Sequence, residues 1–135
     1  MTMMTTAIDT NVLVRAVIDD GSAQAALARK TIREAKAIVA TLPALCEAVW
    51  VLRTSYQKQR TDIALLLEDL LALPNLCCEL AAVQYGIAAL KRGADFADAV
   101  IAWEGKRLGA DEFLSFDRRA VRLLSSPDMR TRLLR

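Results

Sequence analysis

Histidine is absent from this chain of 135 residues, and cysteine, proline and aromatic residues are scarce. Without histidine the chain lacks the commonest general base, the usual partner of a catalytic serine or cysteine, and a principal zinc ligand. The cysteines Cys46, Cys77 and Cys78 are odd in number, and the adjacent pair lacks a usual metal-ligand spacing. We therefore expect all three to be reduced and to lie in or near the core. Any catalysis must use carboxylates, hydroxyls, basic side chains or bound metal.

Long apolar runs are also missing. Hydrophobic residues make up 54% of the chain, too many for a disordered protein. No uninterrupted apolar stretch, however, approaches the roughly 18 residues that a membrane span needs. The start of the sequence carries no basic leader and no small-residue cleavage site after an apolar stretch. We therefore expect a soluble, cytoplasmic protein of one domain, residues 1–135, that buries roughly two thirds of its unfolded surface.

Charge is nearly balanced but unevenly distributed. A net charge of +2 does not make the whole molecule a strong attractor of nucleic acid. Beyond Ser115 the chain becomes basic, with Asp117 and Asp128 outnumbered by arginines. This tail could meet phosphates or an acidic partner, or it could be a solvated final helix with a frayed end. The arginines are Arg118, Arg119, Arg122, Arg130, Arg132 and Arg135.

Hydrophobic periodicity predicts short strands that alternate with helices. This alternation favours an α/β fold, a three-layer α/β/α sandwich around a mainly parallel sheet of four to five strands. In such sheets the ligand site lies outside the carboxyl ends of the strands, where Asp9 and Asp117 are predicted to fall. The strands are expected at residues 5–8, 37–40, 76–80 and 112–116, and the helices from 11, from a Ser22 cap to about 36, from Pro43 to about 58, from a Thr61 cap to Pro74, over 83–92, from Asp95 to Gly109, and from Asp117 through 124.

Four acids, Asp9, Glu47, Asp98 and Asp117, lie among apolar neighbours. Glu47, for example, stands in the sequence Leu-Cys-Glu-Ala-Val-Trp. Burying one ionised carboxylate without a partner costs several kcal/mol or shifts its pKa until it takes up a proton. The pattern therefore predicts that the four carboxylates are buried and converge on a shared counter-ion.

A hard divalent cation, Mg²⁺ or Mn²⁺, suits carboxylate oxygens, and no cluster of soft ligands competes for the ion in this sequence. Such a cation can lower the pKa of a bound water and neutralise the leaving oxygen at a phosphorus centre, without any histidine. Thr10, Asn11 and Ser115 stand close in sequence to the acids. Their side chains could orient the water or the phosphate.

Several of these acids also have a purely structural interpretation. Asp9 can end a strand in an Asx-turn, and Asp117 can cap the helix that follows it. Asp95 and Asp98 have the spacing of a capping box. Glu47 gains about 0.3–1 kcal/mol from a place near a helix start, which does not offset burial in so apolar a segment.

Four segments, in order along the chain, contain these acids: Ala7-Ile-Asp-Thr-Asn-Val-Leu-Val-Arg, Leu45-Cys-Glu-Ala-Val-Trp-Val-Leu-Arg, Ala94-Asp-Phe-Ala-Asp-Ala-Val-Ile-Ala and Leu114-Ser-Phe-Asp-Arg. They resemble the four acidic motifs of PIN-domain proteins. The resemblance covers nearly the whole chain and is closest to the VapC-type toxins of bacterial toxin–antitoxin pairs. A match of four motifs in order is far more specific than any lone short pattern, and it implies one PIN domain over residues 1–135.

The resemblance implies a Mg²⁺- or Mn²⁺-dependent endoribonuclease whose cation is held by the same four acids. It also implies a homodimer, and a small antitoxin that blocks the cleft and binds promoter DNA together with the toxin. Asp95 matches an additional acid of many members, Ser115 a position usually held by Thr or Ser, and Asn11 a polar position beside the ligands. Arg119 departs from the pattern, because some members place an acid or amide there, so a further ligand is in doubt.

Three other functions share some of these sequence features. A non-catalytic PIN-like module that binds RNA or a protein would be expected to lose one or more of the four acids, and none is missing. A phosphatase with Asp9 as its nucleophile normally needs a second aspartate two residues later, where this chain has Asn11. A nuclease that cuts DNA shares the same metal chemistry, and these residues do not separate it from a ribonuclease.

Overall fold

A computed structural model describes residues 4–135, and its strands and helices alternate along the chain. Residues 1–3, the start of the segment considered as a leader, lie outside this range. The chain divides into two compact units, one that ends at Leu80 and one over Ala81–Arg135. Each unit contains its own parallel sheet. None of the described helices is long and apolar enough to cross a lipid bilayer.

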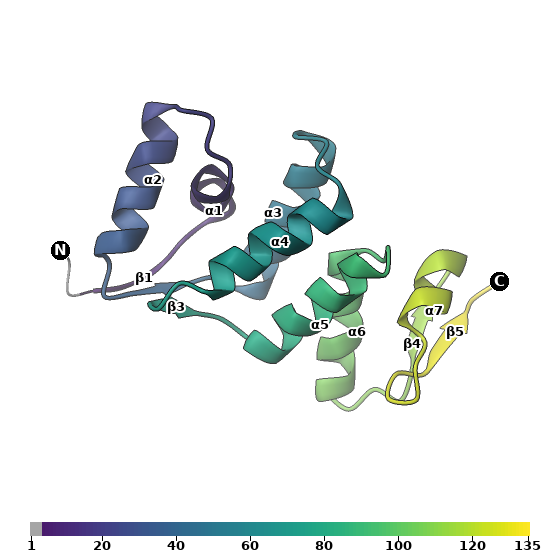
Figure 1. Ribbon diagram of the computed structural model, residues 1–135. Coiled ribbons are helices and arrows are strands. Elements are labelled where there is room, and N and C mark those ends of the chain that lie inside the picture. The colour runs from purple at the N-terminus through teal and green to yellow at the C-terminus, as the bar shows by residue number, and fades with distance from the viewer. Residues whose placement is uncertain (1–3) are drawn as a thin grey trace. The chain divides into compact units, whose positions relative to one another are not determined.

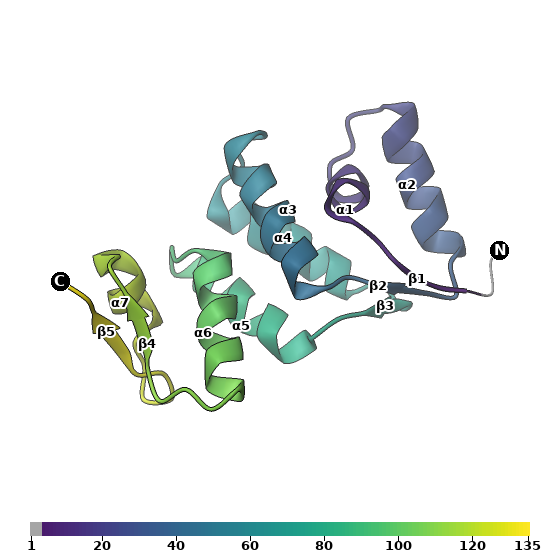
Figure 2. The same cartoon turned by 180° about the vertical axis from the view of Figure 1, so that it is seen from behind.

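The first unit is built on a three-stranded parallel sheet in the order β1-β2-β3. Ile38 of the middle strand stands opposite Thr6 and Leu76, and its side chain is fully buried. Parallel neighbours need a crossover connection, and here each crossover consists of two helices. In Figures 1 and 2, α1 and α2 lie to one side of the strands. The elements are β1 (Thr5–Ala7), α1 (Thr10–Val17), α2 (Ala23–Glu34), β2 (Ala37–Val39), α3 (Leu42–Thr54), α4 (Arg60–Leu71) and β3 (Leu76–Cys77).

The core of the first unit consists of apolar side chains from its helices and from β2. Leu13 of α1, Leu45 of α3 and Ile63 of α4 are each at most 1% exposed. Burial of a side chain of this size contributes about 1.5–3 kcal/mol, so these contacts hold the helices to one another. α1 packs against both α2 and α3. This packing fixes the start of α1 next to the start of α3, where two of the acids lie.

The second unit contains a two-stranded parallel sheet, β4-β5, with α7 as its crossover. Phe113 stands opposite Thr131, and Ser115 stands opposite Leu133. α7 packs against both strands, and the hydroxyl of Thr131 donates a hydrogen bond to the carbonyl of Val121 at 2.7 Å. The elements are α5 (Leu80–Lys91), which begins at the boundary, α6 (Phe96–Arg107), β4 (Phe113–Ser115), α7 (Arg118–Leu124) and β5 (Thr131–Leu133).

α5 and α6 approach each other closely at Gly86. The ring of Phe96, which is fully buried, covers this glycine, and a Cβ built at position 86 would lie only 2.4 Å from the ring carbon Cε1. Real Cβ atoms do not approach a carbon so closely. The absence of a side chain at Gly86 is therefore what allows Phe96, the first residue of α6, to lie against α5.

The α/β class and the parallel strand pairing are confirmed. The strands fall into two sheets, a division that the sequence did not indicate. Thr61 was wrongly predicted as a cap, because α4 begins one residue earlier, after Gln59. The frayed end considered for the basic tail was also wrong, since residues 131–133 pair with β4. The three cysteines form no disulfide within the described residues, and Cys77 is exposed, whereas it was predicted to lie in or near the core.

Candidate acidic site

Asp9 and Glu47 line one shallow pocket of about 390 Å³ in the first unit. Asp9 follows β1 and caps α1, because its Oδ1 accepts a hydrogen bond from the backbone N–H of Val12 at 3.0 Å. Glu47 projects from the second turn of α3. Thr10, at the start of α1, lines the same pocket. The structure therefore brings together two of the four predicted acids and one of the predicted supporting residues.

Thr41 also lines this pocket, although it was not among the site residues predicted from the sequence. It is the N-cap of α3, and its hydroxyl accepts a hydrogen bond from the backbone N–H of Ala44 at 3.4 Å. A threonine two residues before a proline is a recognisable helix start, since proline is favoured in the first turn. The helix was predicted to start at Pro43 itself, so the cap two residues earlier was missed.

The second unit contains another acidic group, formed by Asp95, Asp98 and Asp117. Asp95 caps α6, and its Oδ2 accepts a hydrogen bond from the backbone N–H of Asp98 at 3.2 Å. Asp98 is the third residue of that helix, so the predicted capping-box spacing is confirmed. Asp117 caps α7, and its Oδ1 accepts hydrogen bonds from the N–H groups of Arg119 and Ala120. Ser115 supports this turn, since its Oγ accepts from the N–H of Asp117 at 3.0 Å.

Asp98 is the most perturbed of these carboxyl groups. Partial burial raises its pKa above the ordinary value for an aspartate, and the negative charges of Asp95 and Asp117 raise it further. Desolvation and like charges both disfavour the ionised form of an acid. Asp98 is therefore repelled by the carboxylates of Asp95 and Asp117, and a cation bound beside Asp98 would relieve that repulsion.

The predicted burial of the four acids was wrong. Asp9, Glu47 and Asp117 are exposed and Asp98 is partly buried, and none of the described charged or polar residues falls in the buried class. The reason is local geometry. The apolar neighbours of Glu47, such as Ala48 and Val49, face the core from another side of α3, whereas Asp9 and Asp117 stand at helix starts that face solvent. Apolar flanks in a sequence do not by themselves bury the residue between them.

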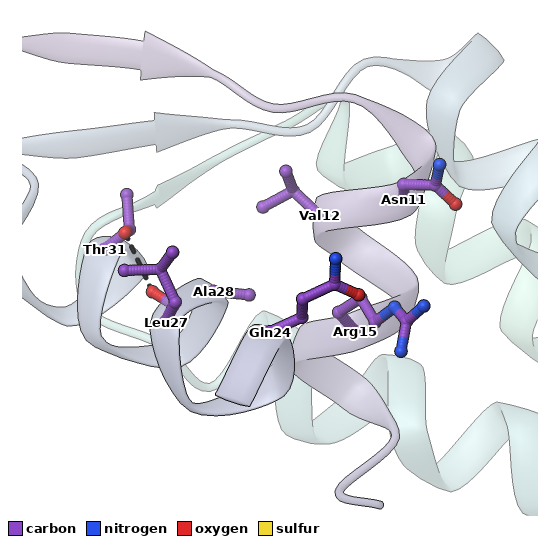
Figure 3. A pocket seen from close by; sticks show the side chains of 7 residues that line it. All are labelled: Asn11, Val12, Arg15, Gln24, Leu27, Ala28 and Thr31. Atoms are coloured by element: carbon purple, nitrogen blue, oxygen red, sulfur yellow. Dashed lines mark hydrogen bonds between the residues drawn. The ribbon is translucent and has the colours of Figure 1, made fainter. Parts of the chain in front are cut away.

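Asn11 lies elsewhere. It lines a pocket of about 370 Å³ between α1 and α2, together with Val12, Arg15 and other residues (Figure 3). Asn11 is one residue further into α1 than Thr10, and a step of one residue turns a side chain by about 100° around a helix. Asn11 is therefore not among the residues that line the pocket of Asp9 and Glu47.

Each acidic group offers carboxylate oxygens, the donor type that Mg²⁺ and Mn²⁺ prefer. Within residues 4–135, no three acid or cysteine side chains lie close enough together to hold a metal ion. Each group by itself is therefore a partial ligand set. Asp9, Asp95 and Asp117 each use one oxygen to cap a helix, and the second oxygen accepts no hydrogen bond from the described residues. These second oxygens are open to a cation.

Comparison with known proteins adds an independent observation. No curated protein sequence matches the chain significantly. The PIN domain family, however, matches residues 6–123, a span that contains all four acids of the sequence motifs and reaches across both units. PIN domains are generally metal-dependent nucleases, and the α/β architecture with parallel sheets is consistent with their α/β/α fold. The chain belongs to the PIN domain family.

Proposed function

We propose that this protein is a Mg²⁺- or Mn²⁺-dependent endoribonuclease that acts as the toxin of a toxin–antitoxin pair. One observation supports the nuclease assignment. All four acids of the motifs lie within the family match, with Asp9 and Glu47 in one pocket and Asp98 beside Asp95 and Asp117. The resemblance of the four motifs to the VapC-type toxins supports the choice of RNA and the toxin role.

The proposed catalytic residues are Asp9, Glu47, Asp98 and Asp117, which would hold the cation, with Asp95 as an additional ligand. A cation held there supplies Lewis-acid activation of water and offsets negative charge at the phosphodiester. The chain itself contributes rigid placement. The helix caps fix the carboxylates of Asp9 and Asp117 through their backbone hydrogen bonds, and Ser115 fixes the turn that carries Asp117.

The nuclease proposal is tested with labelled RNA and single Asp→Asn variants. Asparagine caps a helix about as well as aspartate, so Asp9→Asn keeps the cap of α1 and removes only the charge. Asp98 is the third residue of α6 and caps nothing, so Asp98→Asn removes the charge from a side chain of the same shape. Alanine at position 9 would instead cost about 1 kcal/mol through the lost cap. We expect a loss of cleavage of at least about a hundredfold in Mn²⁺ for each variant, a magnitude typical of a lost transition-state contact. Asp62→Asn, in the first turn of α4, is the control and should cleave like the original protein.

The same assay separates the alternatives. Cleavage that persists in EDTA contradicts the metal mechanism. A single-stranded DNA of the same sequence, cut as fast as the RNA, favours a deoxyribonuclease or a nuclease without sugar preference. RNA that is bound but never cut, in any divalent cation, favours the non-catalytic binding module.

The toxin role concerns the protein in its cell. We propose that it acts in the cytoplasm as a homodimer. A cognate antitoxin blocks its acidic site, and the toxin binds promoter DNA only through that antitoxin. Expression of the intact protein should slow bacterial growth, whereas expression of Asp98→Asn should not. Growth that is unaffected by the active protein counts against the toxin role without touching the nuclease assignment.

A further inference from the structure

Phe116 is an exposed aromatic residue next to a proposed catalytic acid. Its side chain is 76% exposed, more than that of any other large hydrophobic residue in the described range. The chain contains few aromatic residues, and Phe96 by contrast is fully buried in the core of the second unit. An exposed phenylalanine loses the stabilisation that burial would provide, so a binding role is a physical reason to keep it there.

The backbone on both sides of Phe116 is held in place. The carbonyl of Ser115, the last residue of β4, accepts a hydrogen bond from the N–H of Leu134 at 2.8 Å. The N–H of Asp117 donates to the Oγ of Ser115 at 3.0 Å, and Asp117 in turn caps α7. The ring is therefore presented to solvent from a rigid turn, which lowers the entropy that a ligand must remove on binding.

Two arginines on α7, the helix that follows Phe116 along the chain, add positive charge. Arg118 and Arg122 stand four residues apart on α7, so they share one face of the helix, and both are exposed. Neither forms a salt bridge with any residue of the described range. Two like charges at this spacing destabilise a helix slightly, and bound anions would remove that cost. An exposed aromatic ring, followed along the chain by a helix with two unpaired guanidinium groups on one face, matches a nucleobase and the phosphates that flank it.

We propose that Phe116 is the platform on which one base of the RNA strand stacks, while Arg118 and Arg122 hold adjoining phosphates. The proposal rests on the proposed nuclease function and places the substrate strand next to Asp117. Stacking on one ring requires a base that is free of its duplex partner, so the side chain selects unpaired segments. Phe116 is thus a substrate-binding residue, and its contribution belongs to affinity rather than to the chemical step.

Binding is measured first, in EDTA, so that cleavage does not interfere. A fluorescently labelled single-stranded RNA is titrated with Phe116→Leu, which keeps an apolar side chain of similar size and removes the aromatic face. We expect binding about 5- to 150-fold weaker, because stacking of one base on an aromatic residue contributes about 1–3 kcal/mol. Phe116→Trp should restore the affinity. Leu108→Ala, at another strongly exposed apolar position of the second unit, should change nothing.

Salt dependence separates the ring from the arginines. Arg118→Gln and Arg122→Gln should each reduce the slope of log affinity against log salt by about 0.7, the value for one phosphate contact to a single strand. Phe116→Leu should leave the slope unchanged. Arg33→Gln on α2, which removes the same charge from the first unit, should leave both the slope and the affinity unchanged.

Abasic substitution identifies the stacked base. In a series of oligonucleotides with one abasic nucleotide each, one position should weaken binding to the original protein but not to Phe116→Leu, because both changes remove the same contact. If Phe116→Leu binds every oligonucleotide as the original protein does, the proposal is wrong. Unchanged RNA binding together with weaker self-association would assign the ring to a protein contact instead.

Kinetics in Mn²⁺ separate substrate binding from the chemical step. Phe116→Leu should raise KM with kcat nearly unchanged, whereas Asp98→Asn should abolish turnover. If the protein is not a nuclease, only the cleavage assay in Mn²⁺ would show it, because the binding assay in EDTA does not depend on cleavage.

Discussion

At the residue scale, three of the acids can combine a structural role with the proposed catalytic one. Asp9, Asp95 and Asp117 each cap a helix with one carboxylate oxygen and leave the other open. The structural interpretation of these acids and the proposed catalytic one are therefore compatible, because a carboxylate has oxygens for both. Glu47 differs, since it lies in the second turn of α3 and caps nothing.

Asp98 provides a prediction about stability and pH. Its pKa is raised in the folded protein by burial, by Asp95 and by Asp117, so the folded state binds this proton more tightly than the unfolded state does. The free energy of unfolding therefore falls as the pH rises from the pKa of an aspartate in the unfolded state, about 3.9, through the raised pKa of Asp98 in the folded state. We expect Asp98→Asn to have a higher Tm than the original protein at pH 7, and we expect the gain to vanish below about pH 4. Thermal unfolding at both pH values tests this.

A divalent cation provides the matching control. Mn²⁺ should raise the Tm of the original protein at pH 7, because a ligand that binds only the folded state stabilises it. It should raise the Tm of Asp98→Asn much less. Equal stabilisation of both proteins by Mn²⁺ would show that the cation binds away from Asp98.

At the scale of elements, the contact of α5 with α6 depends on Gly86. Gly86→Ala would place its Cβ 2.4 Å from the buried ring of Phe96, so the helices must separate or the ring must leave its position. Overpacking of this kind typically costs about 1–3 kcal/mol of unfolding free energy, which outweighs the gain in helix propensity. Denaturant unfolding of the variant measures the loss.

Gly105 of α6 is the matched control. A Cβ at this position meets only the Cβ of Ala110 at 3.8 Å, an ordinary van der Waals contact. Gly105→Ala should therefore stabilise the protein by about 0.5–1 kcal/mol, the propensity difference in a helix interior. Equal effects at the two glycines would contradict the packing explanation.

Local signals predicted most of the elements. Ser22, Asp95 and Asp117 are strong N-caps, and each begins a helix where the sequence indicated one. β5 was missed because Thr131–Leu133 is only three residues long and has a charged residue, Arg132, at its centre, and because its pairing with β4 is a tertiary contact. Burial of the acids was predicted wrongly for a related reason. Which helix face meets the core depends on the neighbouring elements, and flanking residues alone do not reveal it.

At the scale of the whole molecule, the proposed homodimer needs an apolar contact surface. Trp50 on α3 is 65% exposed, and tryptophan is among the residues that contribute most to protein interfaces. We expect Trp50→Lys to weaken self-association by about 2 kcal/mol or more, roughly thirtyfold. Analytical ultracentrifugation measures the change, with Leu108→Lys as the exposed control. A dimer of unchanged strength in Trp50→Lys would exclude α3 from the interface.

The proposed double use of the capping carboxylates has an evolutionary consequence. An aspartate codon becomes an asparagine codon by one base change, and the amide still accepts the hydrogen bond of the helix start. A descendant of this gene could therefore lose its charge at Asp9 or Asp117 in one step and still fold. Inactive copies that keep their shape, and with it their binding surfaces, should arise easily from such an ancestor.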